Sequence, residues 1–152
     1  MLFSQLKKEQ PQLKQKLENI AQQFKLHSLL IMQSTPDSMI VFAANEQPIY
    51  SAGDEGPKSV QTGCHELYCE RVVNDKAELL VADAAQSEEW KGNEDLVKFG
   101  LGVYFGVPII HNDQVIGTVC ALNDKAFDFA KGDPSSMTEI RNLKQHIESL
   151  LA

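Results

Sequence analysis

The sequence is poor in cysteine and aromatic residues, and it has no long apolar run. Only three of the 152 residues are cysteines and 7% are aromatic. A membrane-spanning helix needs about 20 consecutive apolar residues, and no such run occurs. The first ten residues, MLFSQLKKEQ, lack the apolar stretch of a signal peptide. The odd cysteine count fits reduced thiols, so we expect a cytoplasmic protein without a membrane partner.

Positive charge is also scarce. The chain has 14 basic against 21 acidic residues, which gives a net charge of −7. Binding to nucleic acid or to anionic lipid depends on clustered lysine and arginine. The lysines of the first 25 residues are interspersed with Glu9 and Glu18, which is typical of a solvated helix face. We therefore expect no nucleic-acid partner.

The remaining composition is that of an ordinary folded domain. Hydrophobic residues make up 43% of the chain and charged residues 23%, close to the average for globular proteins. A chain of this length buries roughly two-thirds of its unfolded surface, enough for one core. We predict a single domain over residues 1–152.

Both ends of the chain show the three-to-four spacing of amphipathic helices. Apolar residues predict an N-terminal helix over residues 1–26, interrupted at Pro11, which cannot donate a backbone hydrogen bond. Ile140, Leu143 and Ile147 share one face of a predicted C-terminal helix over residues 135–151.

The stretch 28–122 favours strands and short helices, and it is predicted to form the sheet and a pocket. The predicted elements are strands 28–34 and 39–44 joined by a turn, a short strand at 49–50 within a mobile connection 45–63, a helix at 65–73, a strand at 78–82, irregular helices over 84–100 and a hairpin of strands 102–110 and 114–122. This order indicates an α+β fold: an antiparallel sheet of five to six strands, with the terminal helices on one face and loops on the other.

The last hairpin carries a resemblance to a known family. Residues 106–110 (GVPII) and 115–121 (VIGTVCA) resemble the signature hairpin of GAF domains, which are related to PAS domains. Residues 68–70, 79–83 and 89–93 are similar to the middle of GAF domains in bacterial sensor histidine kinases and diguanylate cyclases, and the resemblance covers residues 23–151. It implies a small-molecule sensor in signal transduction that pairs as a homodimer through its terminal helices and acts on a kinase or cyclase output domain.

Three residues of this hairpin also have a purely structural interpretation. Gly106 and Gly117 lie inside strand patterns, where glycine usually marks a bulge or the close approach of another backbone or a ligand. Pro108 has no N–H group, so it is expected at an edge or bulge position.

Catalysis and metal binding are the first alternatives. Free methionine-R-sulfoxide reductases are cysteine-dependent GAF domains, but Cys64, Cys69 and Cys120 do not reproduce their cysteine spacing. Cys64-His65 with Cys69 suits a soft metal in residue type, yet it has no standard zinc spacing. We therefore predict no enzyme activity and no metal site, and we interpret Cys69 and Cys120 as small buried apolar groups.

Two cofactor-like ligands of GAF domains are also disfavoured. The cyclic-nucleotide pattern is echoed by Asn123, Lys125 and Phe129, but Asp124 splits the Asn-Lys pair and Pro134 replaces the expected glutamate. A chromophore-bearing cysteine is usually followed by histidine, and the motif around Cys64-His65 is missing. No cofactor is predicted.

The remaining hypothesis is an apolar pocket with a few orienting polar groups. The residues expected around it are Tyr68, Cys69, Trp90, Asn93, Leu96, Phe99, Tyr104 and Phe105. Strand alternation sends Tyr104 and Phe105 to opposite faces, so at most one of them lines the pocket. A ligand is expected to order the cover over residues 83–100 and to shift the terminal helices.

The rival hypothesis is a ligand-free GAF fold that serves only for dimerisation or interaction. For either hypothesis, the N-terminal stripe of Leu13, Leu17, Ile20 and Phe24 forms a dimer interface or packs on the chain's own sheet.

Overall fold

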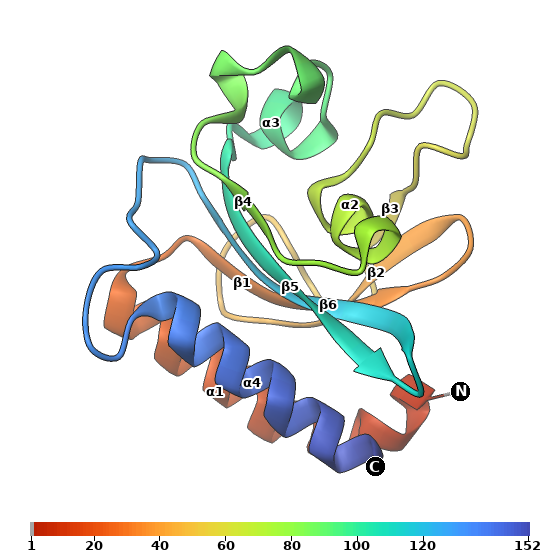
Figure 1. The fold of residues 1–152 in the computed structure, drawn as a ribbon, viewed down its shortest axis with the longest axis vertical. Coiled ribbons are helices and arrows are strands. Elements are labelled where there is room, and N and C mark those ends of the chain that lie inside the picture. The colour runs from red at the N-terminus through yellow and green to blue at the C-terminus, as the bar shows by residue number, and fades with distance from the viewer. Residues whose placement is uncertain (1) are drawn as a thin grey trace.

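A computed structural model describes residues 2–152 and shows one antiparallel sheet between two dissimilar layers (Figure 1). Its six strands are β1 (Ser28–Ser34), β2 (Ser38–Ala44), β3 (Glu55–Pro57), β4 (Leu79–Val81), β5 (Val103–His111) and β6 (Gln114–Asn123). They lie in the order β3-β2-β1-β6-β5-β4. The predicted α+β fold is confirmed, with six strands.

The terminal helices cover one face of the sheet. They are α1 (Gln10–Phe24), which follows a 3-10 helix η1 (Leu2–Glu9), and α4 (Ser136–Leu151), and they lie side by side (Figure 1). Pro11 lies in the first turn of α1, where its missing N–H is not needed. Ser135 caps α4 by accepting a hydrogen bond from the Thr138 N–H at 3.2 Å.

The other face carries short helices and loops. These helices are α2 (Tyr68–Asp75), the 3-10 turns η2 (Ala84–Gln86) and η3 (Glu88–Trp90), and α3 (Glu94–Phe99). The long connection from β2 to α2 runs over the same face. The strand predicted at residues 49–50 is wrong: the strand of this region is β3, and the Gln47 side chain instead holds the backbone N–H groups of Ile49 and Tyr50 in a turn.

Strand alternation divides the interior into two cores. On β6, Val119 and Ala121 belong to the core under the terminal helices, whereas Cys120 and Leu122 belong to the core under α2. The stripe of α1 lies in the first core: Leu13 and Leu17 are 0% exposed. This stripe therefore packs against the chain's own sheet and is not free to form an interface.

The signature hairpin adopts the expected turn and irregularities. Asn112 and Asp113 have φ values of 51° and 65°, as in the two-residue turns that suit hairpins. The register of β5 against β6 shifts between Ile109 and Ile110, next to the pairing of Ile109 with Gly117. A Cβ on Gly117 would lie 2.1 Å from the Met32 carbonyl oxygen of β1, so this glycine permits close approach of the neighbouring strand.

Pro108 lies at an edge position, as predicted. Strand β4 pairs with β5 only over Tyr104–Gly106, so Pro108 falls beyond its end. Beyond the end of β4, the side chain of Glu148 on α4 accepts a hydrogen bond of 2.7 Å from the Ile110 N–H of β5. No helix within residues 2–152 is long and apolar enough to cross a bilayer.

Candidate functional site

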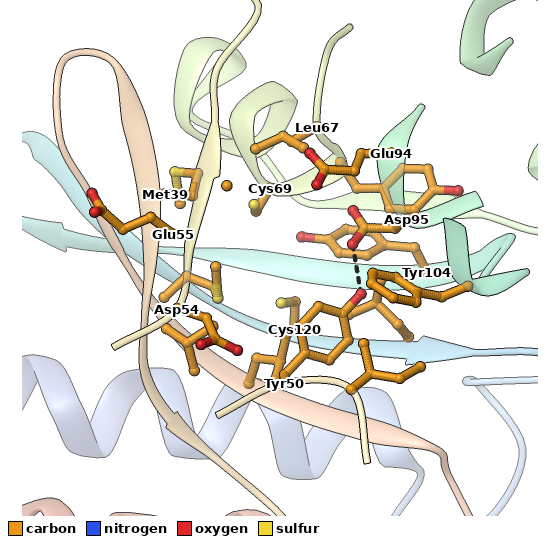
Figure 2. A pocket seen from close by; sticks show the side chains of 18 residues that line it. Met39, Tyr50, Asp54, Glu55, Leu67, Cys69, Glu94, Asp95, Tyr104 and Cys120 are labelled. Atoms are coloured by element: carbon orange, nitrogen blue, oxygen red, sulfur yellow. Dashed lines mark hydrogen bonds between the residues drawn. The ribbon is translucent and has the colours of Figure 1, made fainter. Parts of the chain in front are cut away.

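A cavity of about 240 Å³ lies between the sheet and the layer of loops and short helices (Figure 2). Its lining comes from five strands, from α2 and α3, and from the connection after β2. The lining residues are Leu30, Met32, Met39, Val41, Ile49, Tyr50, Asp54, Glu55, Gly56, Leu67, Tyr68, Cys69, Glu94, Asp95, Phe99, Tyr104, Cys120 and Leu122.

The floor of the cavity is apolar because alternate residues of four neighbouring strands face it. Leu30 and Met32 come from β1, and Met39 and Val41 from β2, each pair two residues apart. β6 supplies Cys120 and Leu122, and β5 supplies Tyr104. The pattern of the strands thus creates the floor without any special motif.

One wall is an aromatic cluster that starts on α2. The Tyr68 ring packs 4.8 Å from the Trp90 ring and 5.0 Å from the Tyr104 ring, measured between centroids. The Tyr68 hydroxyl donates to the Leu101 carbonyl at 2.9 Å. Tyr68 is therefore fixed at both its ring and its hydroxyl group.

The cover of the cavity joins two segments far apart in sequence. Tyr50, in the connection after β2, donates a hydrogen bond of 2.5 Å from its hydroxyl to Asp95 Oδ1 on α3, which Figure 2 shows as a dashed line. The Tyr50 and Phe99 rings meet edge to face at 6.0 Å. Gln47 fixes the turn that carries Tyr50, since its Nε2 donates to the Tyr50 carbonyl at 2.7 Å.

Negative charge gathers at the cavity without a positive counterpart in the lining. Asp54, Glu55, Glu94 and Asp95 are among the 18 described lining residues, and no lysine, arginine or histidine is. Glu94 pairs with Lys98 at 2.8 Å, on the exposed side of α3. Burial raises the pKa of Asp95, the Tyr50 hydrogen bond opposes this rise, and the Glu94 charge adds to it.

The Tyr104 hydroxyl is the one buried side-chain polar atom of the described chain without a hydrogen-bond partner. Tyr104 is 1% exposed and lines the cavity. Burial above all, and then the neighbouring Cys120 thiol, raise the pKa of Tyr104. Sulfur is only a weak acceptor, so the thiol is a poor substitute for an oxygen or nitrogen partner. An unsatisfied buried hydroxyl costs about 1–3 kcal/mol.

Gly106 makes room for this hydroxyl. A Cβ at residue 106 would lie 2.1 Å from the Tyr104 hydroxyl oxygen. The sequence predicted a bulge here or the close approach of another backbone or a ligand, whereas the group that approaches Gly106 is the Tyr104 side chain.

The two cavity cysteines are poor nucleophiles. Burial raises the pKa of Cys69 well above its ordinary value and that of Cys120 to about 12. Since the thiolate is the reactive form, both side chains remain neutral thiols at physiological pH. Within the described residues, no group of three or more histidine, cysteine, aspartate or glutamate side chains is arranged to hold a metal ion.

The structure brings four of the eight predicted site residues to the cavity: Tyr68, Cys69, Phe99 and Tyr104. Three others stand behind the lining. Trp90 supports the Tyr68 ring, Leu96 packs against the same core, and Asn93 caps α3 through the Leu96 N–H while donating to the Glu66 carbonyl.

Phe105 does not line the cavity. It lies in the opposite core, where its ring is 5.7 Å from that of Phe129. Strand alternation predicted that Tyr104 and Phe105 would part in this way, and Tyr104 is the one that faces the cavity.

Sequence reasoning missed the cover and the carboxylates. Of the predicted cover over residues 83–100, only Glu94, Asp95 and Phe99 line the cavity, and the rest of the cover is the segment Ile49–Gly56. That segment was interpreted as a short strand and a mobile connection. The sequence signal for this part of the cover was Tyr50, a large aromatic residue between Pro48 and Gly53, because a large side chain in a loop usually packs against the protein.

Solved structures of other proteins share this fold. A crystal structure of a methyl-accepting chemotaxis protein, residues 122 to 287, superposes with a TM-score of 0.69 and 14% identity, covering 99% of this chain and 94% of that one. The GAF domain of an Acinetobacter phosphoenolpyruvate-protein phosphotransferase gives a TM-score of 0.66 at 15% identity, with 91% and 78% covered. At these identities the likeness establishes the fold alone.

An enzyme is also among the similar structures. Free methionine-R-sulfoxide reductase from Neisseria meningitidis, in complex with its substrate, superposes with a TM-score of 0.67 at 12% identity, covering 93% of this chain and 76% of that one. No curated protein matches the sequence. The family pattern described as GAF domain matches residues 11–140, and the chain therefore belongs to the GAF domain family.

Proposed function

We propose that this GAF domain binds a small organic molecule in the cavity and regulates a signalling partner according to whether the cavity is filled. The observation that carries the proposal is the composition of the cavity: an apolar floor under a few convergent polar groups, which is the usual make-up of a ligand site. The cavity is smaller than the roughly 300–1,000 Å³ of sites for drug-sized ligands. A small metabolite suits it.

Binding accounts for the thiols better than catalysis does. Cys69 and Cys120 face the cavity, but their raised pKa values keep them protonated. A reductase needs a reactive thiolate at its substrate. Neither cysteine supplies one, so the likeness to methionine sulfoxide reductases supports a shared fold rather than a shared reaction.

Two routes connect the cavity to the rest of the molecule. Ligand contact with Tyr50, Asp95 and Phe99 would stabilise the closed cover. Contact with Cys120 and Leu122 would act on β6, whose alternate residues Val119 and Ala121 lie in the core under the terminal helices. A ligand that prefers one arrangement of these elements shifts the equilibrium between arrangements.

We propose that the output passes through α1 and α4 to a kinase, cyclase or similar partner in the cytoplasm. The apolar stripe of α1 is buried in the chain's own core, so a homodimer through the terminal helices would use their outer faces. There a groove of about 230 Å³ is lined mainly by polar side chains, among them Lys16, Asn19, Gln23 and Glu139.

Native mass spectrometry and a metabolite thermal-shift screen test the binding proposal. Wild-type protein is expected to retain a small molecule or to unfold at a higher temperature with at least one metabolite. Val41→Phe, which adds ring volume within the cavity, is expected to abolish that response.

Val97→Phe is the matched control, because Val97 is 68% exposed and does not line the cavity. Circular dichroism verifies that both variants are folded. A wild-type protein that is empty and that responds to no metabolite would contradict the proposal and favour the interaction module.

A further inference from the structure

We infer that the ligand is a small organic cation, an amine or quaternary ammonium that carries no carboxylate, bound with its positive group between Asp95 and the tyrosines of the cavity. This inference rests on the proposed function and adds the chemical class of the ligand. Three independent features support it: the charge of the lining, the unpaired Tyr104 hydroxyl and the aromatic rings.

The charge of the lining selects against anions. Four acidic residues and no basic one line the cavity within the described residues. Glu94 is already paired with Lys98, and Glu55 points away from the other lining side chains in Figure 2. The negative charge at the cavity therefore comes from Asp54 and Asp95. An anionic ligand would bring like charge to a partly desolvated site, where repulsion is strong because the local dielectric is low. A zwitterionic amino acid would leave its own carboxylate without a partner. A cation meets charges of opposite sign.

Asp95 is the carboxylate best placed to hold the cation. Its Oδ1 accepts the Tyr50 hydroxyl at 2.5 Å, which leaves further acceptor capacity on the carboxylate. The nearby Lys98 charge lowers the pKa of Asp95, but less than burial and the Glu94 charge raise it. Lys98 itself is engaged with Glu94. A ligand ammonium would supply the counter-charge that the lining lacks.

The Tyr104 hydroxyl is a second polar group beside the cavity floor, where it lies against Gly106. It is fully buried and has no partner among residues 2–152. The other two cavity tyrosines have acceptors: the Tyr68 hydroxyl donates to the Leu101 backbone carbonyl and the Tyr50 hydroxyl to the Asp95 carboxylate. A hydroxyl oxygen with free lone pairs accepts an N–H from an amine, so a ligand that bears N–H or polarised C–H groups would fill this unmet position.

The rings complete a cation site. Tyr50, Tyr68, Phe99 and Tyr104 all line the cavity, and aromatic faces attract organic cations, quaternary ammonium ions above all. An inorganic ion fits less well, because hard cations need several converging oxygen ligands and no metal-binding group of side chains is present in the described chain.

Isothermal titration calorimetry with matched compounds tests the inference. Choline and n-butylammonium are the cations, 3,3-dimethylbutan-1-ol and 1-pentanol are neutral compounds of similar shape, and valerate is the anion. At least one cation is expected to bind about tenfold or more tightly than its neutral counterpart. Equal or tighter binding of the alcohols or of valerate would overturn the inference, as would an equal response to K⁺ or Ca²⁺.

Asp95→Asn is expected to weaken binding of that cation by about tenfold or more, whereas Asp124→Asn is the matched control and leaves it unchanged. Asp124 is exposed and does not line the cavity. An unchanged affinity in Asp95→Asn would overturn the inference. A retained or screened ligand that proves neutral or anionic would overturn it while leaving the proposed function intact. If no compound of any class binds, the proposed function fails, and the inference fails with it.

Discussion

Tyr50 and Asp95 are 45 residues apart in sequence, and a hydrogen bond of 2.5 Å from the tyrosine hydroxyl to the aspartate carboxylate joins them over the cavity. This contact, together with the packing of Tyr50 on Phe99, fastens the connection after β2 to the short helix α3. Figure 2 shows this hydrogen bond among the side chains that line the cavity.

Tyr50→Phe should loosen this closure while keeping the ring contact with Phe99. Loss of one hydrogen bond to a charged acceptor is expected to lower the free energy of unfolding by about 1–2 kcal/mol. Hydrogen exchange should quicken in residues 47–56 and 94–99 and stay unchanged in α4. Uniform quickening across the molecule would instead mean that Tyr50 supports global stability and not the cover.

Asp95→Asn should stabilise the ligand-free protein at neutral pH. Burial raises the pKa of Asp95 above its ordinary value of 3.8, so the folded state binds a proton more readily than the unfolded state. The stability contributed by this group is therefore fully present below pH 3.8 and is lost as the pH rises through the raised pKa. Asparagine has no charge to desolvate, and its side-chain oxygen still accepts the Tyr50 hydroxyl.

The measurement is the urea midpoint of Asp95→Asn and wild type between pH 4 and 8. We expect Asp95→Asn to have the higher midpoint at pH 7 and the gap to close as the pH falls. A variant that is less stable than wild type at pH 7 would show that Asp95 has a favourable charged partner in the folded state.

Tyr104→Phe and Tyr68→Phe form a matched pair. The Tyr104 hydroxyl is buried without a partner, so its removal should raise the free energy of unfolding by about 1 kcal/mol. The Tyr68 hydroxyl donates to the Leu101 carbonyl, so its removal should lower that energy by about 1–2 kcal/mol. Chemical denaturation of the ligand-free proteins measures both, and a loss of stability of the same size in both variants would contradict the difference between the two hydroxyls.

Thiol labelling of the native protein should modify Cys64 first. Cys64 is half-buried, whereas Cys69 and Cys120 are buried and their raised pKa values keep them protonated. Iodoacetamide at pH 8 is expected to add one equivalent quickly and two more only on unfolding, as read by peptide mass spectrometry. Rapid labelling of Cys120 in the folded protein would reopen the possibility of thiol catalysis.

Leu17→Asp should unfold the protein rather than dissociate an oligomer. Leu17 is 0% exposed in the core under the terminal helices, and an unpaired buried carboxylate is expected to cost about 4 kcal/mol or more. Gln12→Asp, at an exposed position of the same helix, is the control and should remain folded. A folded but monomeric Leu17→Asp protein, from a dimeric wild type, would contradict the burial of the stripe.

The periodic parts of the fold were predictable because each element carries its own pattern. Residues 114–122 alternate between two buried faces, and 136–151 repeat every three to four residues, so strand and helix followed directly. The connection 45–63 has no such period. The strand expected at residues 49–50 failed because the Gln47 side chain satisfies those backbone groups locally, a contact that hydrophobic periodicity does not encode.

The sequence by itself determined the α+β class, the GAF hairpin, the acidic surface and the separation of Tyr104 from Phe105, because these depend on composition and on neighbours within one element. Only the tertiary structure decided where the charge and the hydroxyl groups meet. Asp95 and Tyr50 become partners, and Tyr104 is left without one, because the packing of a loop and a short helix over the sheet depends on contacts between distant residues. The cavity and its excess of carboxylates are products of that packing.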